Sequence, residues 1–444
     1  MEDGEEGKKP TKERKNLEDG EPRALDNEPK RNTEGRRLDC RRVRPQAGLS
    51  DSKKGAKGRN VGAATASQDS QRQELARKDE PMINEAKLTV SGLRARAVNV
   101  ELERAVQTSS WEIPTAPLVL IDLETEEETS GHAYVFSYTP LALEPLRRLV
   151  ANLGTTLKGH AVAPLEIDRK LQEMFLLLGP QGLTAIAASG IDMAAWDALA
   201  RFYDLPLIEL LGGGEKRVAA YGSLRTMYPQ SVEEEARELA KLGFDAYKVK
   251  VGYGDVGEDL ETIEALRGVI GDDAKLAVDY NQSLSVTGAL ERVRILDDEG
   301  LYWIEEPTRA DDFVGHARIA QEARTPICIG ENWWGPHDAQ KSLEAGSCDY
   351  GMPDAMKIGG VTGWIRTAAL AEPSGLPLTS HIFPEISAHL LAASPTAHRL
   401  EYLDLAGPIL KEPLRIEDGH ALVSDRPGIG LEWDEQAVER YVVR

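Results

Sequence analysis

Apolar and polar positions alternate along residues 88–100, and two short apolar runs follow at residues 116–123 and 131–138. A period of two residues is typical of strands that bury one face. Residues 187–200 instead form a longer run of small and apolar residues, which is typical of a helix that other helices approach closely. This order predicts an α+β domain over residues 86–216, in which a small antiparallel meander precedes helices.

Between the first two of these strands lies a segment, residues 104–117, that carries Val106 and Ile113. A long loop with apolar side chains is typical of a lid over a pocket or of a surface that packs onto a neighbour. We therefore expect a loop here that either covers a binding site or packs onto a neighbour.

After residue 217, strand-like runs and amphipathic helical segments alternate. The runs, rich in apolar and β-branched residues, lie at residues 218–223, 246–251, 276–281, 303–306, 327–331, 350–354, 378–381 and 400–403. Alternation of strands and helices at this spacing predicts a parallel sheet. Eight strands in one domain favour a closed barrel over an open sheet.

Each of these strands ends in a polar residue that is capable of chemistry. The residues are Ser223, Lys250, Asp279, Glu305, Glu331, Asp354, His381 and Glu401. One polar residue at the end of a strand has no special meaning. A whole succession predicts an active site, because the carboxyl ends of barrel strands meet at one mouth.

Three carboxylates, Asp279, Glu305 and Glu331, end successive strands at equal spacing along the chain. A single acid here would as often form a salt bridge or a helix cap. Three acids around one mouth repel one another unless a cation binds between them, and three oxygen ligands with room for water suit Mg²⁺. Calcium usually takes more protein ligands, and zinc prefers His or Cys. Glu306 is expected beside this site and not as a ligand.

Lys248 and Lys250 are two positions apart on one strand, so both side chains lie on the same face. Alone, this pattern fits a solvated edge strand. At a metal site, crowding of the two lysines by each other and by the metal is expected to lower their pKa values, which makes a neutral amine base available. His381 is expected on the opposite side, with Asp354 fixing its tautomer. Glu401 is expected as a protonated acid that donates a hydrogen bond to a substrate oxygen.

These groups suit abstraction of a proton beside a carboxylate, through an enediolate whose charge a divalent cation, a lysine ammonium and a hydrogen bond neutralise. Two bases on opposite faces allow one to remove the proton and the other to return it, which is racemisation. If the second group instead protonates a β-hydroxyl, the same intermediate loses water and the enzyme is a dehydratase. The residues leave both reactions open.

Composition narrows the class of protein. The net charge of −21 argues against a nucleic-acid partner. The cysteines, Cys40, Cys328 and Cys348, are too scattered for a disulfide framework or a zinc site, and no long apolar run or secretory signal is present. We therefore expect a cytoplasmic protein without a membrane span. Residues 1–85 are charged and poor in aromatic and β-branched residues, which predicts a disordered tail.

At the residues of the predicted site, the chain resembles the enolase superfamily, mandelate racemase subgroup. The resemblance extends over longer stretches, which include residues 91–100, 187–198, 278–283, 303–308, 330–333, 352–365 and 385–398. It implies an α+β capping domain, a (β/α)₇β TIM-like barrel over residues 217–407, and a segment over residues 408–444 that returns to the capping domain. It also implies a homo-oligomer, an octamer.

The resemblance implies roles for single residues. Mg²⁺ would be held by Asp279, Glu305 and Glu331. Lys250 would be the base for the S enantiomer, and His381, with Asp354, the base for the R enantiomer. The substrate carboxylate would be bound by Lys248, Glu401 and Ser223, its α-hydroxyl would contact Asn281, and its apolar group would lie against Val106, Ile113 and Tyr138.

The sequence departs from the subgroup pattern in the region that sets specificity, at Ser110, Trp111, Glu112 and Leu224. The chemistry is therefore better supported than the substrate. The leading hypothesis is a racemase that acts on mandelate or a similar small-molecule 2-hydroxy carboxylate. An acid-sugar dehydratase on the same scaffold is the alternative, and a non-catalytic binding protein is a distant one.

Overall fold

The computed structural model describes residues 87–108, 112–252 and 254–443. These residues belong to one compact unit that begins at Ile83. The expected disordered tail, residues 1–85, lies outside the described residues, as do Ser110 and Trp111 of the expected lid.

An antiparallel sheet with the strand order β1-β2-β3 opens the described chain, as the meander pattern predicts. Its strands are β1 (Val90–Gln107), β2 (Glu112–Thr125) and β3 (Ser130–Phe136). The helices that follow are α2 (Pro140–Leu157), α3 (Pro164–Phe175), α4 (Leu183–Phe202) and α5 (Leu207–Leu210). Helix α4 packs closely on this sheet because Gly190 has no side chain: a Cβ there would lie 2.5 Å from Cδ1 of Ile121.

The prediction of a loop over residues 104–117 is wrong for the described residues on either side of 109–111. Instead, β1 and β2 continue as paired strands, and Val106 lies opposite Ile113 in the register. Pairing satisfies backbone groups that a loop would leave to water. An irregularity in the register between Glu101 and Val106 allows this extension. The predicted lid is therefore the distal part of a β-hairpin.

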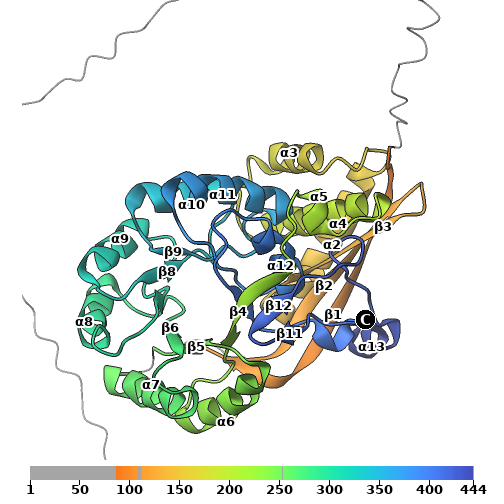
Figure 1. The fold of residues 1–444 in the computed structure, drawn as a ribbon. Helices are drawn as coiled ribbons and strands as arrows, with labels where there is room; N and C mark the ends of the chain where they lie inside the picture. The colour runs from red at the N-terminus through yellow and green to blue at the C-terminus, as the bar shows by residue number, and fades with distance from the viewer. Residues whose placement is uncertain (1–86, 109–111, 253, 444) are drawn as a thin grey trace, which may run out of the picture. The chain divides into compact units, whose positions relative to one another are not determined.

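The second region contains the predicted alternation of strands and helices, with the helices outside the strands (Figure 1). Its strands are β4 (Arg217–Ser223), β5 (Ala246–Lys250), β6 (Lys275–Asp279), β7 (Ile304–Glu305), β8 (Ile327–Ile329), β9 (Tyr350–Gly351) and β10 (Leu400–Tyr402). Its helices are α6 (Pro229–Leu239), η1 (Ala240–Leu242), α7 (Val256–Ile270), α8 (Val286–Leu296), α9 (Phe313–Glu322), α10 (Pro336–Ala345), α11 (Gly360–Ser374), α12 (Pro384–Ala392) and η2 (Gly407–Ile409).

Neighbouring strands from β4 to β9 pair in parallel, and β10 pairs in parallel with β4. All residues of β5 are buried, as expected for a strand with both faces covered. The expected strand at residues 378–381 is only partly correct. In this described segment, Leu378 forms single parallel bridges to Gly351 and to Ala397 instead of a regular strand. The parallel path therefore passes from β9 to β10 through isolated bridges.

The C-terminal segment contacts both regions. Its strands β11 (Ile416–Glu417) and β12 (His420–Leu422) form a hairpin, and β12 pairs antiparallel with β4. Helix α13 (Glu435–Tyr441) lies beside β1, where the Arg96 guanidinium contacts the Glu435 carboxylate at 2.6 Å. Because all these elements share one compact unit, the domain boundaries at residues 216 and 407 stay predictions.

One buried hydrogen-bonded pair joins α4 to the start of α11. The Asp192 carboxylate of α4 accepts a hydrogen bond from the backbone N–H of Thr362, at 2.9 Å, and one from its hydroxyl, at 2.5 Å. Both side chains are buried. The carboxylate thus satisfies a backbone N–H in the first turn of α11 that the helix itself leaves without a partner.

We expect Asp192→Ala to lower the free energy of unfolding by about 1–3 kcal/mol, because it leaves buried donors of Thr362 without an acceptor. Urea unfolding followed by circular dichroism measures this change. Asp273→Ala, at an exposed position, is the matched control and should unfold like the unaltered protein. Equal midpoints for the Asp192 and Asp273 variants would contradict the prediction.

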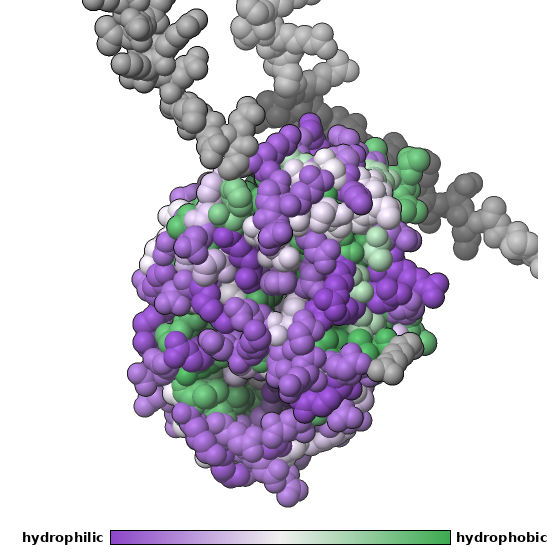
Figure 2. Space-filling view, turned by 90° about the vertical axis from the view of Figure 1, so that its right-hand side faces the viewer, coloured by the Kyte–Doolittle hydropathy of each residue, from purple (hydrophilic) through white to green (hydrophobic). Residues whose placement is uncertain are grey.

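The face that includes the β1–β3 sheet and α13 is mainly hydrophilic, with smaller hydrophobic patches between polar side chains (Figure 2). Among the helices of the described residues, none combines the length and the apolar character that crossing a bilayer requires.

Candidate active site

Neighbouring strands bring the predicted site residues into register. Lys250 at the end of β5 lies opposite Asp279 at the end of β6, which in turn lies opposite Glu305 at the end of β7. Glu331 follows β8 after Gly330, whose φ of 136° a residue with a side chain rarely adopts. A Cβ on Gly330 would also lie 2.8 Å from the backbone nitrogen of Met352. The chain therefore turns at Gly330 to bring Glu331 to the same mouth.

The carboxylates of Asp279, Glu305 and Glu331 lie together: one oxygen from each is within 4.8 Å of the others. All three side chains are buried. Burial raises the pKa of Asp279 and of Glu305, and neighbouring carboxylates raise it further. A divalent cation would relieve this repulsion, and oxygen donors are the ligands that Mg²⁺ prefers. The donor set therefore fits the predicted magnesium.

Lys248 lies among carboxylates. Its Nζ is 2.7 Å from Oε1 of Glu305, 2.8 Å from Oε1 of Glu401 and 3.7 Å from Oδ2 of Asp279. Burial by itself lowers the pKa of Lys248, but Glu305 and Glu401 outweigh this and raise the pKa well above its ordinary value. The expected lowering by crowding is therefore wrong for Lys248, because anions and not cations surround it. The carboxylates therefore favour the charged form of Lys248.

Lys250 has a different environment on the same face of β5. Its Nζ donates a hydrogen bond to a neutral acceptor, the backbone carbonyl of Leu224, at 3.3 Å. The side chain is buried and lines the pocket at the mouth of the strands. Lys250 therefore contacts a neutral group at the pocket, whereas Lys248 contacts carboxylates.

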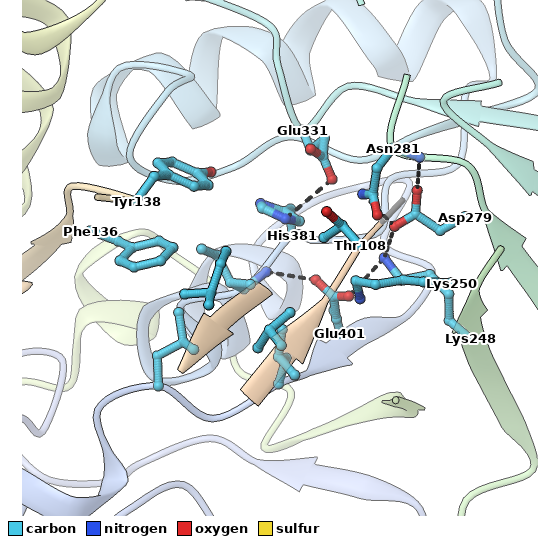
Figure 3. Close-up of a pocket in the computed structure, with 15 residues that line it drawn as sticks. Thr108, Phe136, Tyr138, Lys248, Lys250, Asp279, Asn281, Glu331, His381 and Glu401 are labelled. Atoms are coloured by element: carbon cyan, nitrogen blue, oxygen red, sulfur yellow. Dashed lines mark hydrogen bonds and ion pairs between the residues drawn. The ribbon is translucent and has the colours of Figure 1, made fainter. Parts of the chain in front are cut away.

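His381 lies between two acids. Its Nδ1 is 2.7 Å from Oδ2 of Asp354, and its Nε2 is 3.2 Å from Oε2 of Glu331. Burial lowers the pKa of His381, but Glu331 and the hydrogen bond with Asp354 raise it above the ordinary value. Asp354 is itself fixed, because its Oδ1 accepts hydrogen bonds from the backbone N–H groups of Met356 and Lys357. In Figure 3, Lys250 and His381 reach the pocket from different sides.

Glu401 is held as an acceptor. Its Oε2 accepts a hydrogen bond from the backbone N–H of Ile382 at 2.8 Å, and its Oε1 contacts Lys248. Burial raises the pKa of Glu401, but Lys248 and His381 outweigh it and lower the pKa to about 2. The expectation of a protonated Glu401 is therefore wrong for this structure, because two cationic groups stabilise the carboxylate.

Two predicted substrate contacts have unused hydrogen-bonding capacity. Ser223 lies opposite Lys248 in the sheet, and its buried hydroxyl has no partner among the described residues. Asn281 donates from Nδ2 to Oδ2 of Asp279 at 2.9 Å, which leaves its buried Oδ1 without a partner in the same part of the chain. Asn281 lines the pocket, whereas Ser223 is not among the residues that line it.

The far wall of the pocket is apolar and comes from both regions of the chain (Figure 3). It includes the predicted Val106, Ile113 and Tyr138. Further residues of the lining were not predicted from the sequence, namely Thr108, Phe136, Ile382, Leu403 and Leu405. Two of them could have been found from their spacing along the sequence, because Phe136 lies two positions before Tyr138 and Leu403 two positions after Glu401.

Models of two protein families match most of the described chain. The model described as "Mandelate racemase / muconate lactonizing enzyme, N-terminal domain" matches residues 91–212, and the model described as "Enolase C-terminal domain-like" matches residues 231–437.

Relatives with different reactions resemble the chain. The structure of an enolase from Bradyrhizobium, complexed with magnesium and mandelic acid, shares 43% identity and a TM-score of 0.78, and covers 81% of this chain and 99% of its own. A 3,6-anhydro-α-L-galactonate cycloisomerase from Streptomyces coelicolor is 33% identical over 73% of this chain and 91% of its own length. An L-talarate/galactarate dehydratase from Salmonella typhimurium is 34% identical over 62% of this chain and 70% of its own length.

Proposed function

Because the chain belongs to the mandelate racemase/muconate lactonizing enzyme family and is a magnesium-dependent enzyme of the enolase superfamily, we propose that it racemises a 2-hydroxy carboxylate with an apolar substituent, such as mandelate. In this proposal, one base removes the α-proton and a second base on the opposite face returns a proton. The carboxylate end of the substrate lies at the acidic and basic groups, and its substituent lies against the apolar wall.

The observation that carries the proposal is the contrast between the two ends of the pocket. Charged groups gather at the strand ends, whereas the far wall is formed by aliphatic and aromatic side chains, among them Val106, Ile113, Phe136, Leu403 and Leu405. Among the described residues of this wall, only Thr108 and Tyr138 carry a hydroxyl that could pair with the distal hydroxyls of a sugar acid, and a polar group that loses water without a new partner weakens binding. A phenyl or alkyl substituent gains free energy from the same wall.

Proton transfer would involve Lys250 and His381. For one enantiomer, the neutral amine of Lys250 takes the α-proton and becomes an ammonium, while the imidazolium of His381 gives a proton to the other face and becomes neutral. The other enantiomer uses the same groups in reverse. The hydrogen bond of 2.7 Å with Asp354 keeps the proton on Nδ1, so that Nε2 is the nitrogen that exchanges a proton with the substrate.

The remaining polar groups would bind the carboxylate. Lys248, held between Glu305 and Glu401, contributes a fixed positive charge, and Asn281 offers its free Oδ1 to the α-hydroxyl. Asp279, Glu305 and Glu331 would hold Mg²⁺, which supplies positive charge beside the carboxylate oxygens as the proton leaves.

Dehydration of an acid sugar is the second candidate. The relatives include a dehydratase that acts on talarate and galactarate, and the raised pKa of His381 suits an acid that protonates a β-hydroxyl as it leaves. Both reactions share removal of the α-proton and differ in what the second group does.

We expect the protein with Mg²⁺ to convert (R)-mandelate to the racemic mixture, which removes its circular dichroism signal without forming a 2-keto acid. Incubation with mandelate and, separately, with a set of aldonic and aldaric acids tests this, with semicarbazide detecting 2-keto products. A semicarbazide-reactive product from a sugar acid, with mandelate unchanged, would overturn the racemase proposal in favour of the dehydratase.

A further inference from the structure

Lys357 is a buried cation that the proposed reaction does not use. It lies between β9 and α11, three residues after Asp354, and only 5% of it is exposed. Its Nζ donates a hydrogen bond to Oδ1 of Asn332 at 2.7 Å and lies 4.7 Å from the centre of the Tyr138 ring. Burying a lysine costs free energy unless its surroundings compensate, so this position calls for an explanation.

Asn332 connects Lys357 to two acids of the site. Its Nδ2 donates to Oε1 of Glu331 at 3.0 Å and lies 3.1 and 2.9 Å from the two oxygens of Glu306. The amide oxygen of Asn332 thus contacts a cation, and the amide nitrogen contacts carboxylates.

An amide side chain has one acceptor oxygen and one donor nitrogen, and it can rotate to exchange them. With Lys357 on one side, the rotated amide would point its NH₂ at an ammonium and its oxygen at the carboxylates, and both contacts would be repulsive. Lys357 therefore determines which way Asn332 points, and Asn332 in turn holds Oε1 of Glu331.

Glu331 is thus fixed at both oxygens, since its Oε2 lies 3.2 Å from Nε2 of His381. A carboxylate fixed in this way does not need to reorient when a cation binds. Partners that orient metal ligands from behind typically contribute a factor of about 10–100 to metal affinity.

We propose that Lys357 is a positioning residue for Mg²⁺: it acts through the Asn332 amide to orient the Glu331 carboxylate. The inference rests on the magnesium site and not on the identity of the substrate, so it can fail while the racemase proposal holds, and the reverse.

Calorimetric titration of metal-stripped protein with Mg²⁺, in the absence of substrate, tests the inference. We expect Lys357→Met to weaken Mg²⁺ binding by about 10- to 100-fold. Lys411→Met, which makes the same change at an exposed lysine outside the site, is the matched control and should bind Mg²⁺ like the unaltered protein.

A double-mutant cycle distinguishes an effect of Lys357 that passes through the Asn332 amide from an effect of its positive charge alone. Asn332→Ala should weaken Mg²⁺ binding to a similar degree, and the double variant of Lys357 and Asn332 should lose little more, because both changes break one chain of contacts. Additive losses, or an affinity within about 2-fold of the unaltered protein for either single variant, would overturn the inference. If Lys357→Met does not fold, Asn332→Ala alone decides the question, because the route runs through its amide.

Discussion

Lys250→Met and His381→Asn are each expected to slow racemisation strongly while retaining exchange of the α-proton of one mandelate enantiomer. We expect overall racemisation to fall by about 10²- to 10⁴-fold in each variant, the range that a general acid or base contributes. In D₂O, each variant should still exchange the α-proton of the enantiomer whose proton faces the remaining base. NMR of each pure enantiomer in D₂O measures these rates.

The physical reason is that the two groups are held independently. Lys250 is on β5 and donates to the carbonyl of Leu224, whereas His381 is held by Asp354 and Glu331. Removing one group therefore leaves the contacts of the other intact.

Lys241→Met is the control for the lysine change, because Lys241 is exposed and outside the site, and it should leave both exchange rates unaltered. Equal loss of both exchange reactions in either variant would contradict two independent bases. Unaltered turnover in Lys250→Met would remove the catalytic proposal and favour a non-catalytic protein.

Removal of the metal is expected to have the second large effect, a complete loss of turnover that added Mg²⁺ restores. Without a cation, the buried carboxylates repel one another, and no divalent cation is present to neutralise the negative charge on the substrate carboxylate. Dialysis against EDTA, followed by titration with Mg²⁺, measures the loss and its recovery. Full turnover of the metal-free protein would contradict the three-carboxylate site.

Asp279→Asn tests the same site without a chelator, because it removes one negative charge and keeps the shape of the side chain. We expect no measurable turnover and no increase in melting temperature on addition of Mg²⁺, whereas a ligand at 100 times its Kd stabilises a folded protein by about 2.7 kcal/mol. Glu264→Gln, at an exposed position on α7, is the matched control and should retain both properties. A normal increase in melting temperature for Asp279→Asn would exclude Asp279 as a ligand.

Much of the fold could be predicted because it depends on local periodicity. The β1–β3 meander and the strands that carry Lys250, Asp279 and Glu305 were predicted from alternation and from buried apolar runs, and the family assignment and magnesium dependence are confirmed. The roles of single site residues stay predictions.

Errors arose where the pairing of one segment with another determines the structure. Residues 104–117 resembled a loop because charged and apolar residues mix there, yet the pairing of Val106 with Ile113 continues the hairpin. Leu378 was expected in a full strand, but its neighbours allow only single bridges. Backbone hydrogen bonds depend on the partner strand, which the local sequence does not specify.

The chain by itself determined which side chains reach the mouth of the parallel strands, because a strand places alternate residues on one face and parallel strands end at one edge. The contacts of these side chains were decided only by the tertiary structure. Two lysines two residues apart are equivalent in the sequence, but Lys248 contacts carboxylates and Lys250 contacts a carbonyl. The link from Lys357 through Asn332 to Glu331 likewise depends on distances between residues on separate segments. Electrostatic interactions and hydrogen bonds depend on these distances in space, which the spacing of residues along the sequence does not give.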